Sequence, residues 1–331
     1  MLATNLMAGW LFFLVAVLVA LLVVGAFSAA TAVAGVEISA GLVAPGVEGG
    51  MVAIPLTVEA RRTVRFLRVG TMVADQQAEL FLPALRRKER RQVILRLAAP
   101  RRGVHAMTTL RVTSAGSVGL FRMVRQVAAV AEIIVRPRFR GMAEPLVGTA
   151  SAGGVARSRR RRGGELFGIR EYLPGDAARH IHWRSSARHR RLMVKEFEEP
   201  GAPVLALVAD VDRSLTPDNL DEIARAAATI AHAALRHGYE VTLLWSGADG
   251  AVVVSEPWEQ IWTALARLRP EGPPLSRALL RLRPQLPPEA VPVTVGGRAW
   301  ASGDGAIAVG PAGSGAEWEY DREGTVRWTG S

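Results

Sequence analysis

The chain has 331 residues, of which 49% are hydrophobic, and its formal net charge is +11. This length accommodates two domains of ordinary size, and the hydrophobic content excludes a wholly disordered chain. The absence of cysteine excludes disulfide bonds, thiolate metal sites and a cysteine nucleophile.

The positive charge is concentrated in one segment. Between Arg157 and Lys195, eleven arginines and one lysine stand against three acidic residues, a net charge of +9, so the remainder of the chain is close to neutral. A partner that recognises this segment should be acidic: a protein surface, anionic lipid headgroups or a nucleic-acid backbone.

The N-terminal segment, residues 1–35, predicts a membrane anchor. No charged side chain precedes Glu37, and the stretch from Trp10 to Val36 is almost wholly apolar. About 20 such residues span a bilayer, since each helical residue rises about 1.5 Å. A secretory signal needs a basic residue before a shorter apolar core, and a core helix normally has a polar face. We therefore predict one transmembrane helix, roughly from Met7 to Ala30.

Residues 36–145 predict an antiparallel β-sandwich. Stretches such as MVAIPLTVEA and RQVILRLAA alternate with period two, and turn-forming glycine and proline separate them. Several short strands at this spacing are typical of a sandwich of about 100 residues. Few side chains here suggest chemistry, so we expect a spacer role.

Residues 146–162 predict a linker rich in glycine and arginine. Small residues and charges cannot bury a core. Five arginines, at positions 157 and 159–162, resemble a lipid or nucleic-acid patch, although solvated arginine runs are common.

Residues 201–331 predict an α/β domain. The apolar runs VLALVAD and YEVTLLW are typical of strands covered on both faces. Between them lies a predicted helix that ends at Gly238, with Thr216 as its N-cap and Pro217 at its first position. Strand, helix and strand form a parallel crossover unit. Helices near 258–268 and 275–282 and a strand at 291–295 extend it, while the tail after Gly296 has no clear pattern.

Residues 163–200 carry the densest set of polar and charged side chains. Pro174 and Gly175 suit a turn, after which Asp176 is expected to cap a helix beginning at Ala177. The helix is expected to turn Ile181, Trp183 and Ala187 toward the body of the domain and to carry a basic rim of Arg179, Arg184, Arg188 and Arg190. The stretch RLMVKEFEE then alternates as a strand.

Three interpretations of this segment are open. In the first, a metal-dependent hydrolase or nuclease uses Glu165, Glu171, Asp176, His180 and His182. The two histidines are two residues apart, however, whereas a zinc protease helix places them four apart. In the second, arginines with Tyr172 and Trp183 bind nucleic acid, which the membrane helix makes less plausible. In the third, which we prefer, carboxylate–guanidinium pairs fix the segment and contact a protein partner.

The same segment resembles the signature of the bacterial domain of unknown function 58 family. The matching positions are Gly164, Glu165, Arg170, Tyr172, Gly175, Asp176, Arg179, Ile181 and Trp183, followed by Ala187, Arg188 and the ending KEFE. Residues 101–121, RRGVHAMTTLRVTSAGSVGLF, also look like the end of the family's β domain. The resemblance implies a membrane-anchored protein whose final α/β domain is Rossmann-like, of the von Willebrand factor A type.

The resemblance also implies partners. Family members are commonly encoded beside MoxR-type AAA+ ATPases, and some beside transglutaminase-like membrane proteins, and no enzymatic activity is established for the family as a whole. We therefore expect a non-enzymatic assembly factor in the bacterial cell membrane, with cytoplasmic soluble domains, that acts with such an ATPase on unknown client proteins. The expected interaction surface comprises Glu165, Arg170, Tyr172, Gly175, Asp176, Arg179, Trp183 and Arg188.

A von Willebrand A-like domain also implies one metal site. Its motif, Asp-x-Ser-x-Ser, falls on the stretch ADVDRSL, which offers Asp210, Asp212 and Ser214 as oxygen donors for Mg²⁺. An aspartate replaces the middle serine, and no downstream threonine or aspartate ligand is evident, so a degenerate site is expected and no other cofactor. Relatives often carry a pair of membrane helices, and this chain begins almost where the second would. Either the given start omits a first helix, or this member has a single span.

Overall fold

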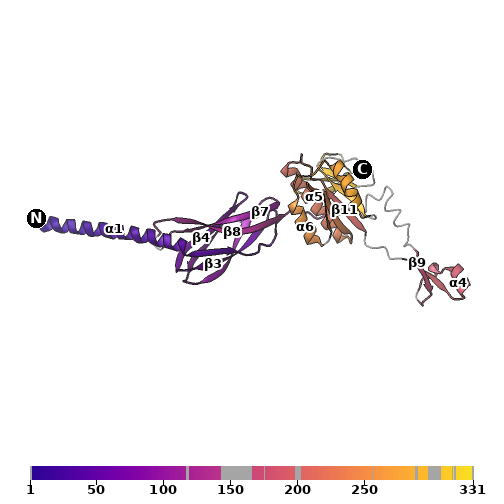
Figure 1. Cartoon of the computed structure of the whole chain (residues 1–331), viewed down its shortest axis with the longest axis horizontal. Helices are drawn as coiled ribbons and strands as arrows, with labels where there is room; N and C mark the ends of the chain where they lie inside the picture. Colours follow the sequence, from indigo (N-terminus) through magenta and orange to yellow (C-terminus); the bar gives the residue numbers. More distant parts are fainter. Residues whose placement is uncertain are drawn as a thin grey trace. The chain divides into compact units, whose positions relative to one another are not determined.

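The computed structural model describes residues 2–116, 119–142, 166–174, 176–197, 203–255, 257–287, 290–296, 307–314, 316 and 318–329. The chain forms two units, Met1–Arg138 and Phe139–Ser331. Figure 1 shows the elements of each unit in the colours of the sequence. The expected linker, residues 146–162, lies outside the described residues.

The first unit begins with helix α1, Leu2–Ala34. Its stretch Gly9–Ala34 has a mean hydropathy of 2.9 and is long and apolar enough to cross a membrane. The side chains from Trp10 to Val24 are exposed along this stretch, whereas Ala29, Ala32 and Val33 are buried against the strands that follow. The apolar N-terminal helix predicted from the sequence is confirmed.

Two sheets follow α1. Their strands are β1 Val36–Ala40, β2 Gly46–Val47, β3 Met51–Ala60, β4 Val64–Val73, β5 Gln76–Leu85, β6 Arg90–Ala98, β7 Gly103–Ser114 and β8 Met123–Arg136. One sheet has the order β1-β3-β6 and the other β2-β8-β7-β4-β5, with every pair antiparallel except β2 with β8. Alternate residues of both sheets, such as Ile54 of β3 and Val69 of β4, are buried in one shared core. The predicted β-rich region is confirmed.

The second unit contains a mixed sheet of seven strands. These are β11 Val204–Ala209, β12 Glu240–Ser246, β13 Ala251–Ser255, β14 Val291–Val295, β15 Ile307–Pro311, β16 Trp318–Tyr320 and β17 Val326–Trp328. They lie in the order β13-β12-β11-β14-β15-β16-β17, parallel from β12 to β16 and antiparallel at both edges. The last three strands form from the tail whose sequence has no clear pattern.

Helices cover both faces of this sheet. Helix α5, Pro217–Arg236, starts as predicted, since the Asn219 amide donates to the Thr216 hydroxyl at 3.2 Å. Leu205 and Leu207 of β11 share a core with α5 and with α6, Trp258–Arg267. The alternate residues Ala206 and Val208 pack with α7, Leu275–Leu282. A buried β11 is therefore apolar on both sides.

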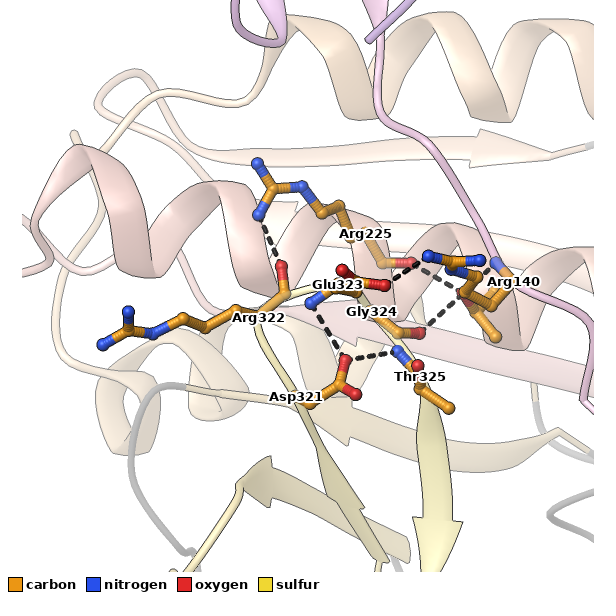
Figure 2. Close-up of polar contacts among 8 residues, drawn as sticks. Arg140, Arg225, Asp321, Arg322, Glu323, Gly324 and Thr325 are labelled. Atoms are coloured by element: carbon orange, nitrogen blue, oxygen red, sulfur yellow. Dashed lines mark hydrogen bonds and ion pairs between the residues drawn. The ribbon is translucent and has the colours of Figure 1, made fainter. Parts of the chain in front are cut away.

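The segment that enters the second unit is fixed to α5 and α6. The Phe139 ring contacts those of His232, Trp258 and Trp262, with centroids 4.3–5.4 Å apart, although the sandwich was expected to extend to residue 145. Figure 2 shows the polar contacts beside it. The Arg140 amide donates to the buried hydroxyl of Thr229, and the Arg140 guanidinium pairs with Glu323 in the turn before β17.

The turn at residues 321–325 is held by its own side chain and by α5. One carboxylate oxygen of Asp321 accepts from the amides of Glu323 and Thr325, each at 2.9 Å (Figure 2). Arg225 donates to the carbonyl of Arg322 at 2.7 Å. A Cβ on Gly324, which has a positive φ, would lie 2.6 Å from that of Arg225, so the turn approaches α5 as closely as glycine permits.

Candidate functional site

The signature segment folds as a small unit around a two-stranded ribbon. Strand β9, Leu166–Glu171, pairs antiparallel with β10, Met193–Phe197, and between them lie a 3₁₀ turn, η2 Ala178–His180, and helix α4, Trp183–His189. Beyond the ribbon, the Tyr172 amide donates to the Leu192 carbonyl at 2.8 Å, and the chain then turns back.

A bidentate ion pair closes this turn. Two guanidinium nitrogens of Arg170 lie 2.7 and 2.8 Å from the two carboxylate oxygens of Asp176. One of these oxygens also accepts from the Leu173 amide at 2.9 Å. The hydrogen bonds from Arg170 and then from Leu173 lower the pKa of Asp176 to about 2. This carboxylate is therefore charged at any physiological pH.

The expected helix from Ala177 is interrupted, which corrects the sequence analysis. Only Ala178–His180 forms a 3₁₀ turn, because Ile181 then pairs with Val194 of β10 and the His182 amide donates to the Met193 carbonyl. These bonds hold the chain extended before α4 begins. Asp176 binds the preceding residues of its own turn and caps no helix.

His182 begins helix α4 and Ser186 attaches it to the ribbon. His182 is the N-cap of α4, and its Nδ1 lies 3.3 Å from the Ser185 amide and 2.7 Å from the Ser185 hydroxyl. The buried hydroxyl of Ser186 accepts from the Met193 amide at 2.8 Å and contacts the His182 carbonyl at 3.1 Å. Hydrogen bonds, more than buried apolar contacts, therefore fix α4 to the ribbon.

The segment has very little core of its own. Among the side chains described from Ile169 to Lys195, only those of Ser186 and Val194 are buried. Trp183 is 68% exposed and Leu173 60% exposed, and Ile169 and Leu192 are exposed as well. Five arginines are also exposed: Arg179, Arg184, Arg188, Arg190 and Arg191. Apolar side chains that face solvent beside arginines are the composition of an interaction surface.

The second candidate place is the loop after β11. Asp210 is 7% exposed, and its Oδ1 accepts from the Asp212 amide at 3.0 Å. Oδ1 of Asp212 accepts in turn from the Ser214 amide at 2.9 Å. The loop lies where the sheet order reverses between β12 and β14, which is where ligands bind in open α/β sheets.

Neighbouring segments hold this loop tightly. Asp212 pairs with Gly272 in an isolated parallel bridge, and the Arg213 side chain donates to the Glu271 carbonyl at 2.9 Å. A Cβ on Gly272 would lie 2.3 Å from the Ser246 carbonyl oxygen, so this position requires glycine. Burial raises the pKa of Tyr320, with the carboxylates of Glu222 and Asp210 adding to the effect, and the tyrosine hydroxyl donates to the Gly296 carbonyl at 2.9 Å.

Comparison with known proteins places these elements. The model of the family described as "Protein of unknown function DUF58" matches residues 168–295, from β9 through β14. This part of the chain matches the DUF58 family. The family resemblance read from the signature is confirmed.

Individual relatives add little beyond the family. The "Uncharacterized protein YeaD" of Bacillus subtilis (strain 168) is 29% identical over 99 residues, which are 30% of this chain and 24% of that protein. The chain thus aligns with about a quarter of this relative's length. The alignment with a solved structure, "Cwp6 from Clostridium difficile", covers 63% of this chain and 29% of the Cwp6 chain at 10% identity. Its TM-score is 0.20.

The DUF58 signature residues divide into two groups. Arg170 and Asp176 meet directly, and Tyr172 continues the ribbon. Arg179, Trp183 and Arg188 are exposed, so the expectation that Trp183 and Ala187 face the body of the domain is wrong. Glu165 and Gly175 lie outside the described residues.

The described residues do not assemble the metal sites considered above. No group of three His, Asp or Glu side chains converges within the described ranges. Nδ1 of His182 is engaged by Ser185, and Nε2 of His180 accepts from Arg179 at 3.2 Å. In the loop after β11, one oxygen of the Asp210 carboxylate and one of the Asp212 carboxylate each accept a hydrogen bond from a backbone amide. This donor set suits an internally braced loop better than a Mg²⁺ site.

Two functional features of the DUF58 segment escaped the sequence analysis. His182, considered above as a metal ligand, and Ser186, which the sequence analysis did not single out, hold α4. The exposed Leu173 and Leu192 flank the turn. A signal for the serine exists: a small hydroxyl one turn into α4 can reach both the N-cap carbonyl and the next strand.

Proposed function

We propose that the protein is a non-enzymatic, membrane-anchored assembly factor whose signature segment docks a protein partner, a MoxR-type AAA+ ATPase, in the cytoplasm. The observation that carries the proposal is the surface of β9–β10, where exposed Trp183 and Leu173 accompany five arginines around a minimal core. Tryptophan and arginine are the side chains most enriched among residues that dominate binding energy.

The ion pair supports docking rather than chemistry. Arg170 donates two guanidinium hydrogen bonds to the Asp176 carboxylate, and this ion pair holds the turn in which Leu173 lies. The exposed side chains are thereby presented from a fixed backbone, which reduces the entropy that binding must overcome. Client proteins, and a transglutaminase-like membrane protein in some systems, would then be brought to the ATPase.

The sheet order supports a von Willebrand A-like role for the second unit. Starting from β11, the strands run 3-2-1-4-5-6 across the sheet as far as β16, which is the doubly wound order. The antiparallel β13 stands at the edge beside β12. We assign this domain to protein interaction, since its switch-point loop is braced internally.

Helix α1 supports anchoring in the bacterial cell membrane. A hydrocarbon core about 30 Å thick needs about 20 helical residues, and the apolar stretch Gly9–Ala34, with 26 residues, exceeds that length. Washing membranes with alkaline carbonate tests this assignment, because an anchored chain stays in the pellet. Protease treatment of spheroplasts tests the cytoplasmic location of the soluble units.

Docking is tested by measuring the affinity of the detergent-solubilised chain for a purified MoxR-type AAA+ ATPase. Trp183→Ala should weaken binding at least about tenfold, as expected of a central aromatic anchor. Arg184→Gln combined with Arg188→Gln should weaken it further and reduce its salt dependence.

Matched controls lie on α7 of the same unit. Leu280 is 72% exposed, and Arg277 and Arg281 are exposed on neighbouring turns. Leu280→Ala and the Arg277→Gln, Arg281→Gln pair remove the same kinds of side chain and should leave the affinity unchanged. Equal affinities for the signature and α7 variants would contradict the proposal.

A further inference from the structure

The end of the sandwich next to α1 is formed by three connecting loops. The turn 61–63 lies there because the Arg61 amide donates to the Gly35 carbonyl directly after the helix. The turn 86–89 adjoins it through the Lys88 amide and the Ala60 carbonyl. Residues 115–116 follow β7, whose last residue, Ser114, pairs with Leu67 of β4, and residues 119–122 lead into β8. Segments far apart in the sequence therefore meet around one helix end.

These three loops are strongly basic. They carry Arg61, Arg62, Arg86, Arg87, Lys88 and Arg122 against a single acid, Glu89. The loops at the opposite end of the sandwich, 48–50, 74–75 and 99–102, carry two acidic and two basic residues. The charge of the sandwich is therefore concentrated at the end where α1 leaves it.

A further arginine lies against the helix terminus itself. Nη1 of Arg125, in β8, is 3.2 Å from the Ala34 carbonyl and 3.4 Å from that of Val33. A guanidinium here satisfies free carbonyls and complements the negative end of the helix dipole. Apolar side chains flank the same loops: Phe66 is 49% exposed and Leu120 52% exposed.

A small cavity opens at this junction. Its volume is about 100 Å³, and it is lined by Ser28, Thr31 and Ala32 of α1, by Arg62, Thr63 and Arg65, and by Gly116. Only glycine fits at position 116, since a Cβ there would lie 2.5 Å from the Ser28 hydroxyl. The Ser28 and Thr31 hydroxyls donate to carbonyls of their own helix, which leaves the guanidinium groups to face the cavity. Two guanidinium groups around such a volume are suited to one phosphate group.

The cavity lies at the depth where phosphates occur in a bilayer. Counting about 20 helical residues from Trp10 brings α1 to the far boundary of the hydrocarbon core near Ala29. Ser28 and Thr31 are therefore at the level of the lipid headgroups. The side chain of Phe27, 67% exposed, is then next to the lipid acyl chains. The exposed apolar side chains of Phe66 and Leu120 suit insertion between headgroups toward the hydrocarbon core.

We propose that this end of the sandwich binds anionic phospholipids, with one headgroup phosphate held in the cavity between Arg62, Thr63 and Arg65. The proposal rests on the membrane anchoring proposed above. Bound lipid fixes the sandwich against the membrane surface, so that α1 does not act as a free tether. The positive charge of the three loops then contacts neighbouring headgroups.

The test is native mass spectrometry of the full chain in detergent with phosphatidylglycerol and phosphatidylcholine in equal amounts. The wild type should retain phosphatidylglycerol in preference. Each arginine near an anionic surface contributes about fivefold to binding, so Arg62→Gln with Arg65→Gln should reduce the preference by about tenfold or more. Arg96→Gln with Arg111→Gln, two exposed arginines within strands β6 and β7, removes the same charge and should leave it unchanged.

The possible outcomes separate the two proposals. If the chain is released from membranes by alkaline carbonate, the anchoring fails. If it stays but shows no preference for phosphatidylglycerol, or if both double variants lose it equally, only the headgroup site is overturned. Displacement of phosphatidylglycerol by millimolar inorganic phosphate would assign the cavity to free phosphate and overturn the lipid proposal.

Discussion

Arg170 and Asp176 face each other through two parallel hydrogen bonds, of 2.7 and 2.8 Å, across a turn of the DUF58 signature. The pair is six residues apart in sequence and joins the end of β9 to the start of η2. Among the side chains described from Ile169 to Lys195, that of Val194 is the one buried apolar side chain, so this contact is a main source of order.

Asp176→Asn should loosen the turn while preserving its shape. Asparagine offers a single carbonyl oxygen, so it cannot accept the Arg170 fork and the Leu173 amide as the carboxylate does. We expect amide hydrogen exchange at Leu173 to speed up at least several-fold, with no change in β11 or α5.

Glu171→Gln provides the control for that experiment. Glu171 makes one long, exposed contact with Arg191, at 3.4 Å, and exposed pairs contribute little. The exchange rate at Leu173 should therefore be unaffected. Equal effects from the two substitutions would show that overall charge, rather than the fork, orders the turn.

The order of the turn should depend on pH in a defined range. The folded-state pKa of Asp176 is about 2, below the ordinary 3.8, so the pair stabilises the segment fully above that ordinary value. The contribution declines as the pH falls below 3.8 and is lost through about 2. Carboxyl carbon shifts of Asp176, followed by NMR during acidification, should show this late titration. A midpoint near 3.8 would argue against the ion pair in solution.

Gly272→Ala should destabilise the second unit. The new methyl group would overlap the Ser246 carbonyl and the Val211 side chain, both under 3 Å from the added Cβ. Overpacking of this kind costs about 1–3 kcal/mol, which lowers the midpoint of thermal unfolding by several degrees. Gly141→Ala is the matched control, because a Cβ at Gly141 meets nothing within 4 Å. Similar midpoints for the two variants would refute the close approach.

Thr229→Val should cost about 1–3 kcal/mol in the free energy of unfolding. The Thr229 hydroxyl is fully buried, accepts from the Arg140 amide and lies 2.9 Å from the Gly324 carbonyl. Valine leaves the Arg140 amide and the Gly324 carbonyl without that partner. Thr263→Val removes a hydroxyl that contacts the preceding turn of its own helix, at Glu259, and denaturant unfolding should show a much smaller effect.

Local signals made much of the fold predictable. The Thr216 cap and Pro217 set the start of α5, and period-two alternation identified the strands of the first unit. The tail was not predictable, because β15 to β17 are only five, three and three residues long. Their side chains, such as that of Trp318, are buried through contacts with neighbouring strands.

The candidate site shows why nonlocal pairing limits such predictions. The sequence favours a helix through Ile181, but pairing of Ile181 with Val194 requires extended backbone. That one bridge changes which side chains face outward, so Trp183 and Ala187 became exposed. The Arg170–Asp176 fork, by contrast, lies within one turn, and acidic and basic residues so near in sequence already favoured pairing.

Leu166 and Phe197 stand opposite each other in the β9–β10 ribbon, so the signature segment leaves the chain and returns to it at a single point. A segment whose two ends are adjacent can be inserted, removed or exchanged with little change to the domain that carries it. The segment can consequently be exchanged as a unit while the β11–β14 scaffold keeps its register, and grafting it between homologues becomes a practical way to test which protein it recognises.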